Sequence, residues 1–242
     1  MLEAAFWGFV GGAALLIGAA IGLRLPLPQR AIGLVMAFGA GTLISSLTFE
    51  LTLEAYNRAG LDAVAAGLPL GALVFFAGDW LIDEWGGKHR KRSGGQQAQG
   101  SGPAIMLGAV LDGIPESAVI GISLLGGAGV GIAFVVAVFI SNLPEGLSAS
   151  TGMKKAGHKA RFILGSWVVV VAASALAAAL GYGLLGGAPA HVVAATQAFA
   201  AGAILTMLAD TMMPEAFQDA GPTVGLVTVF GYATGALLTA VA

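Results

Sequence analysis

The sequence predicts an all-α membrane protein that crosses the bilayer several times, and three observations lead to this class. Of the 242 residues, 57% are hydrophobic and only 10% are charged, and the mean hydropathy is +0.88. Soluble domains usually carry about 25% charged residues. Apolar runs of about 20 residues, the length that crosses the hydrocarbon core, follow one another along the chain. The basic residues gather in alternate connections between these runs.

Eight apolar runs are predicted to form the transmembrane helices of a single membrane domain that covers residues 1–242. Short connections rich in Pro, Gly or charged residues separate most of these runs. Pro26 and Pro28 follow the first run, for example, and Asp62 precedes the third. The predicted helices cover residues 4–23, 31–56, 63–82, 103–125, 129–153, 162–185, 191–217 and 222–242.

The longest polar connection, residues 85–102, joins the third helix to the fourth. Its Gly, Ser and Gln content predicts a flexible loop. Its basic residues are Lys88, Arg90, Lys91 and Arg92. Asp79, Asp83 and Glu84 precede the loop, and we expect them to neutralise its basic residues or to face water on the inner side.

The distribution of Lys and Arg predicts the orientation in the membrane. If the N-terminus lies outside, ten of the eleven Lys and Arg residues fall in cytoplasmic connections, and only Arg58 lies outside. The positive-inside rule favours this arrangement. We therefore expect a multi-pass plasma-membrane protein with both termini on the extracytoplasmic side and the 85–102 loop in the cytoplasm.

Two similar phrases, 29 positions apart, lie in the predicted fourth and fifth helices. Residues 110–117 read VLDGIPES, and residues 139–146 read FISNLPEG. Each phrase places a glutamate directly after a proline in apolar surroundings. Ionisable residues inside a membrane are costly, and Pro115 and Pro144 each remove a helical hydrogen bond and are predicted to kink their helices. A chain that contains both features twice is expected to use them.

The polar residues of the two phrases fall on common helix faces. Asp112 and Glu116 are four positions apart, and Ser141 and Asn142 lie beside Glu145. If the helices face each other, three carboxylates, an amide oxygen and a hydroxyl converge, and neither helix contains Lys or Arg. This predicts a cation site near the middle of the bilayer. Polar bonding between helices and a proton relay are the alternatives.

An internal repeat also predicts a transporter. Residues 37–60 and 198–221 are identical at nine of 24 positions, including Glu54 with Glu215. In the predicted topology the second helix runs outward and the seventh inward, so the two copies are inverted. Inverted repeats with broken helices that meet at the middle of the membrane are typical of secondary transporters.

Four further acidic residues lie toward the ends of the two repeated helices. Glu50 and Glu54 are predicted near the outer end of a pathway, and Asp210 and Glu215 near its inner end. These side chains can pass cations into and out of the central site. The alternative is that they are interfacial polar residues with access to water.

The motifs resemble those of the ZIP (Zrt/Irt-like) metal transporters, in particular prokaryotic-type members. Residues 141–146 are similar to the family motif His-Asn-x-Pro-Glu-Gly, and residues 112–117 to its partner on the preceding helix. Residues 50–55 and 210–215 occupy the places of related phrases on the second and seventh helices. The resemblance covers the whole chain and implies import of zinc, iron(II) or manganese toward the cytoplasm through a binuclear-type site, with no cofactor besides the transported metal.

The resemblance also assigns ligands and shows two departures. Glu116, Asn142 and Glu145 match the family residues, whereas Asp112 and Ser141 stand where histidine is usual. Zinc favours imidazole and thiolate ligands, while oxygen ligands suit harder ions such as manganese. We therefore expect a site that is less selective for zinc. Gly113 and the carboxylate-free sixth helix weaken a second metal position.

Two other functions remain open at this point. One is a proton-coupled or other cation carrier that does not move transition metals. The other is an intramembrane metal-dependent enzyme that uses Glu116 and Glu145, although the chain has no cysteine, no HExxH and no GxSxG. The expected partners are divalent ions and bilayer lipids, not nucleic acid. The small-residue pattern Gly8-x-x-x-Gly12 fits helix packing, and a homodimer is compatible with it.

Overall fold

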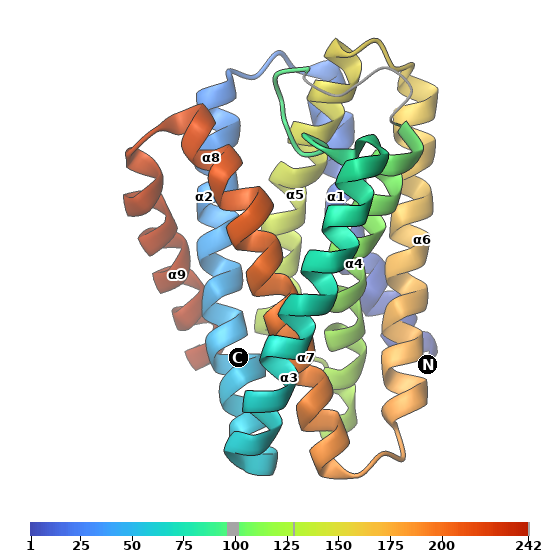
Figure 1. The fold of residues 1–242 in the computed structure, drawn as a ribbon, viewed down its shortest axis with the longest axis vertical. Helices are drawn as coiled ribbons and strands as arrows, with labels where there is room; N and C mark the ends of the chain where they lie inside the picture. Colours follow the sequence, from blue (N-terminus) through green and yellow to red (C-terminus); the bar gives the residue numbers. More distant parts are fainter. Residues whose placement is uncertain (96–101, 128, 242) are drawn as a thin grey trace.

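The computed structural model describes residues 1–95, 102–127 and 129–241, and the regular secondary structure of this part of the chain is entirely helical. The helices run roughly along one axis and form an elongated bundle (Figure 1). The α-helices are α1 Leu2–Arg24, α2 Gln29–Ser46, α3 Leu53–Ile82, α4 Gly102–Ser123, α5 Ile132–Lys155, α6 Ala160–Leu185, α7 Ala190–Met207, α8 Met213–Ala220 and α9 Thr223–Val241. Three π-helical segments, η1 Leu47–Thr52, η2 Asp83–Gly87 and η4 Leu208–Met212, and a 3-10 turn, η3 Leu124–Gly126, extend or join them.

Within the described ranges, seven continuous helical segments are long and apolar enough to cross a membrane. Large apolar side chains cover the outside of the bundle, among them Leu73, Leu184, Phe230 and Leu237. Several carboxyl and amide side chains, among them Asp112, Glu116, Glu145 and Gln197, lie in the interior instead. An apolar exterior around a polar interior is the arrangement expected when lipid is the solvent. The chain is therefore a polytopic membrane protein.

One of the seven segments, Gln29–Gly87, is 59 residues long. A straight helix of this length would measure about 90 Å, about three times the thickness of the hydrocarbon core. Gly60 interrupts the segment, with φ of 76° and ψ of −171°. The chain reverses direction near the end of the bundle where α3 begins (Figure 1). The left-handed φ at Gly60 favours glycine because an L side chain is strained there.

The internal repeat is visible in the backbone. The π-helical segments η1 and η4 begin at Leu47 and Leu208, which are equivalent positions of the two copies. Both copies also end at a glycine with positive φ, Gly60 at 76° and Gly221 at 68°. A π-helical turn alters the register of the helix and is often found at functional sites. The predicted second and seventh helices are therefore each divided by such a turn.

The start of α1 and the end of α9 lie toward one end of the bundle, and the segment of residues 88–95 that follows η2 lies at the other end (Figure 1). This segment contains the basic run of residues 88–92. The relative placement agrees with the predicted topology, in which the termini and this loop are on opposite sides of the membrane.

Candidate metal site

The two Pro-Glu phrases lie in the middle of neighbouring helices in the bundle interior. Pro115 is within α4 and Pro144 within α5. Each proline leaves a carbonyl one turn earlier without its usual helical donor. Helix α1 packs directly over α5, because Gly146 has no side chain and a Cβ there would lie 2.8 Å from the Leu15 Cα. The site is thus built on rigid elements.

All five predicted ligands are buried, with exposed fractions of 2% to 4%. Asp112 and Glu145 are joined through a common partner, because the Lys91 Nζ lies 3.2 Å from the Asp112 Oδ2 and 3.1 Å from the Glu145 Oε2. The antiparallel motifs therefore direct two carboxylates at one cation. In this structure that cation is a lysine ammonium of the chain itself.

Arg90 completes the ion-pair network. Its guanidinium lies 3.2 Å from the Asp112 Oδ1, forms a second ion pair with Asp79 and reaches Asp83 at 3.5 Å. The prediction that Asp79 and Asp83 neutralise the basic loop is confirmed for these two residues. Glu84 is exposed.

The basic loop differs from the prediction in its described part. Residues 96–101 of the predicted flexible loop 85–102 lie outside the described residues. Arg90, Lys91 and Ser93 are buried, with exposed fractions of 4%, 3% and 1%. The expectation that the carboxylates lack a basic partner holds within α4 and α5 but is wrong for the folded chain. Buried carboxylates without a counter-charge are unstable, and the loop supplies that charge.

The network favours the charged forms of both basic side chains. Burial disfavours the Lys91 ammonium, but Asp112 and Glu145 outweigh this effect and hold the pKa of Lys91 above its ordinary value. Burial likewise opposes the Arg90 charge, and Asp112 with Asp79 raises the pKa of Arg90 nonetheless. Both side chains therefore enter the site as cations.

Of the other three predicted ligands, Ser141 and Asn142 form hydrogen bonds elsewhere, and Glu116 has a free acceptor atom in the described part of the chain. The Ser141 hydroxyl donates to the Val138 carbonyl at 2.9 Å, within its own helix. The Asn142 amide donates to the Gly11 carbonyl of α1 at 3.1 Å. The Glu116 Oε1 is buried and has no hydrogen-bond partner in the described part of the chain. Glu116 thus keeps an acceptor oxygen available.

The centre of the site has almost no free volume. A cavity of about 10 Å³ is lined by Arg90, Lys91, Asp112 and Glu145, among others. This is about the volume that one water molecule requires. Among the residues that the structure describes, no three His, Cys, Asp or Glu side chains are arranged to hold a metal ion. The carboxylates are arranged around the loop cations instead.

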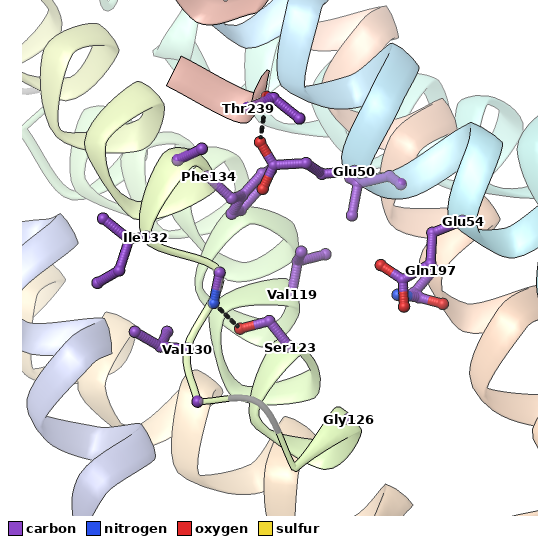
Figure 2. Close-up of a pocket in the computed structure, with 14 residues that line it drawn as sticks. Glu50, Glu54, Val119, Ser123, Gly126, Val130, Ile132, Phe134, Gln197 and Thr239 are labelled. Atoms are coloured by element: carbon purple, nitrogen blue, oxygen red, sulfur yellow. Dashed lines mark hydrogen bonds between the residues drawn. The ribbon is translucent and has the colours of Figure 1, made fainter. Parts of the chain in front are cut away.

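Glu50 and Glu54 line a cavity of about 460 Å³ at the end of the bundle that is opposite the basic loop. Figure 2 shows these side chains with Ser123 of α4 and Gln197 of α7 around the same space. Thr239 donates to the Glu50 Oε1 at 2.8 Å, and Arg58 pairs with the Glu54 Oε1 at 2.6 Å. The two glutamates therefore share one cavity, and their place at the outer end of a pathway stays a prediction.

Asp210 and Glu215 border a smaller cavity of about 170 Å³ beside the basic loop. Asp210 is exposed, whereas Glu215 is 5% exposed. The Glu215 Oε1 accepts hydrogen bonds from the Ser148 hydroxyl at 2.8 Å and the Ser93 amide at 3.1 Å. Of the two predicted inner residues, Glu215 therefore contacts the loop that enters the central site, through its bond with the Ser93 amide.

Four residues of these sites are not among the predicted site residues: Arg90, Lys91, Ser148 and Gln197. The sequence predicts Arg90 and Lys91 only as basic residues of a cytoplasmic loop that mark the membrane orientation and have acidic residues nearby. One signal was present at Gly108, where a Cβ would lie 2.6 Å from the Arg90 Nε. Glycine at this place leaves room for the guanidinium, although the sequence alone does not name the side chain that fills it. Gln197 is 2% exposed, and its Oε1 has no hydrogen-bond partner within the described ranges.

Comparison with known proteins gives a distant similarity to a plant protein. No family model matches the chain. Over 199 residues the chain is 24% identical to an Arabidopsis thaliana protein that is described as a putative zinc transporter. The aligned region covers 81% of this chain and 31% of that protein. The chain thus spans less than two thirds of the length of this relative.

Proposed function

We propose that this chain carries divalent metal cations of the zinc, iron(II) and manganese class across the plasma membrane into the cytoplasm. The observation that carries the proposal is the meeting of Asp112 and Glu145 at one buried cation in an apolar bundle. Two carboxylates that stabilise an ammonium at about 3 Å have the chemistry to bind a metal ion. The similarity to a plant protein described as a zinc transporter supports this proposal.

The proposed topology has eight crossings, with both termini outside. It counts Gln29–Gly87 as two crossings that are joined near Gly60. The shared backbone features of the two repeat copies support an inverted-repeat transporter of the ZIP type. A single transmembrane domain then forms the whole of this chain.

The proposed pathway follows the polar residues through the bundle. A cation enters the cavity beside Glu50 and Glu54, binds at Asp112, Glu116 and Glu145, and leaves past Glu215 and Asp210. The Asn142 amide and the Ser141 hydroxyl are the neutral oxygen ligands of the central site. One group of helices rocks against another to open each side in turn, as in other inverted-repeat carriers.

Flux through reconstituted membranes tests the function. Purified protein in proteoliposomes with a zinc-sensitive dye inside is expected to raise the internal zinc signal above that of protein-free vesicles. A pH-sensitive dye in a parallel sample separates a proton carrier, which would acidify the vesicles without moving metal. An enzyme would move neither ion. Absence of flux for zinc, iron(II) and manganese would reject the proposal.

The composition of the site predicts a broad metal selectivity. We expect the native chain to take up manganese and zinc at comparable rates, because its ligands are oxygen atoms. Asp112→His is expected to shift the ratio toward zinc by about tenfold, since imidazole is a better zinc ligand. Competition between the two metals in the flux assay measures this ratio. Native zinc uptake that excludes manganese at equal concentration would contradict the prediction.

A further inference from the structure

The described part of the basic loop, residues 88–95, is attached to three helices. The Gln29 side chain at the start of α2 donates to the Ser93 hydroxyl at 3.3 Å. The same hydroxyl donates to the Asp219 Oδ2 of α8 at 2.9 Å. The Ser148 hydroxyl of α5 lies between the Lys91 carbonyl and the Glu215 Oε1 and shares its one proton between these two acceptors. These bonds hold the segment across the end of the bundle that carries the Glu215 cavity.

The attachment places the Lys91 ammonium in the centre of the proposed transport site. The ammonium contacts both carboxylates there, and the remaining cavity is about 10 Å³. A metal ion with its ligands in place does not fit beside it. The metal and the ammonium therefore exclude each other.

Helix α4 is shaped to receive the neighbouring arginine. Gly108 lies one turn before Asp112, and the Arg90 side chain passes over its Cα, where a Cβ would meet the Arg90 Nε at 2.6 Å. Arg90 then reaches Asp112 and Asp79 on two different helices. The position of the loop is thus specified by backbone shape as well as by charge.

We propose that residues 88–95 are a tethered competitor of the transported metal: Lys91 fills the cation site of the metal-free carrier, and a divalent ion must displace it. This inference rests on the proposed function for the identity of the site. A tethered ligand acts at an effective concentration in the millimolar range or above. The apparent affinity for the metal then equals the intrinsic affinity multiplied by the fraction of time for which the loop is released.

The competition also favours divalent over monovalent cations. A potassium or sodium ion brings the same charge as the ammonium that it replaces, so the exchange gains no Coulomb energy at the carboxylates. A divalent ion brings twice that charge and binds the same carboxylates more strongly. The loop therefore prevents abundant monovalent ions from occupying the site. It also neutralises the buried carboxylates while no metal is bound.

Hydrogen–deuterium exchange of the purified native chain tests displacement directly. The Ser93 amide is bonded to Glu215, and the Arg90 and Arg92 amides are bonded to the Gly87 and His89 carbonyls. Zinc is expected to accelerate amide exchange in residues 88–95 by about tenfold, because these bonds break when the loop leaves. Potassium chloride at equal ionic strength is expected to leave the exchange unchanged.

Gly108→Ala provides a variant that leaves the proposed metal ligands intact. Its methyl group is expected to displace Arg90, so residues 88–95 should exchange rapidly without zinc, and half-maximal uptake should occur at a zinc concentration about tenfold lower. Gly165→Ala in α6, where a Cβ would have no neighbour within 4 Å, is the matched control and should behave as the native chain.

Lys91→Met removes the competing charge itself, and Lys159→Met, at an exposed position just before α6, is its control. Lys91→Met is expected to lower the zinc concentration for half-maximal uptake, whereas an increase would overturn the proposal. Exchange that zinc leaves unchanged would also overturn it, whatever the flux assay shows. Zinc-accelerated exchange without flux of metal would support displacement of the loop and reject the transport function instead.

Discussion

Glu145→Gln is expected to reduce the initial rate of zinc uptake into proteoliposomes by about 100-fold. Glutamine keeps the size and one acceptor of the side chain but removes the negative charge. Glu145 is one of the two carboxylates that contact the cation at the centre of the bundle, 3.1 Å from the Lys91 Nζ. Loss of that charge weakens binding of any cation there, because charges interact more strongly in a buried site than in water.

The matched control for this variant is Glu3→Gln. Glu3 is exposed in the first turn of α1, far from the ion-pair network, and its replacement is expected to leave uptake at the native rate. Asp112→Asn should resemble Glu145→Gln, since Asp112 contacts the same ammonium. Native uptake rates in both variants would show that the metal passes elsewhere.

Gly71→Val is expected to lower the free energy of unfolding by about 3 kcal/mol, or to prevent folding. Helix α3 crosses α7 at this glycine, and a Cβ there would lie 2.7 Å from the Phe199 carbonyl carbon. Gly202 faces α3 in the same way, 2.8 Å from the Leu68 carbonyl carbon. Small residues on both sides let the backbones approach, and a branched side chain forces them apart.

Reversible unfolding in mixed detergent micelles measures this loss of stability. Gly165→Val is the control, because a Cβ at Gly165 would have no neighbour within 4 Å. It should unfold at nearly the same detergent composition as the native chain. If Gly71→Val and Gly165→Val are equally stable, α3 and α7 are not packed as closely as the structure describes.

Local sequence patterns predicted the secondary structure well where a helix is uninterrupted. The predicted helix 162–185 corresponds to α6, Ala160–Leu185, and the predicted helix 129–153 to α5, Ile132–Lys155. The predicted helix 31–56 continues only as far as Ser46 before the π-helical η1 begins. Hydrophobic patterns do not distinguish a π-helical turn from an α-helical one, so this change was not predictable.

Composition and helical spacing were enough to predict a polytopic membrane protein and to place Asp112 with Glu116, and Asn142 with Glu145, on common helix faces. These are local properties of the chain. The meeting of the two motifs and the charge that neutralises their carboxylates depend on the fold. Arg90 and Asp112 are 22 positions apart and lie in different elements, so only the folded bundle brings them together. The basic residues of the loop predict the membrane orientation, and in the folded chain Arg90 and Lys91 also form ion pairs inside the proposed metal site.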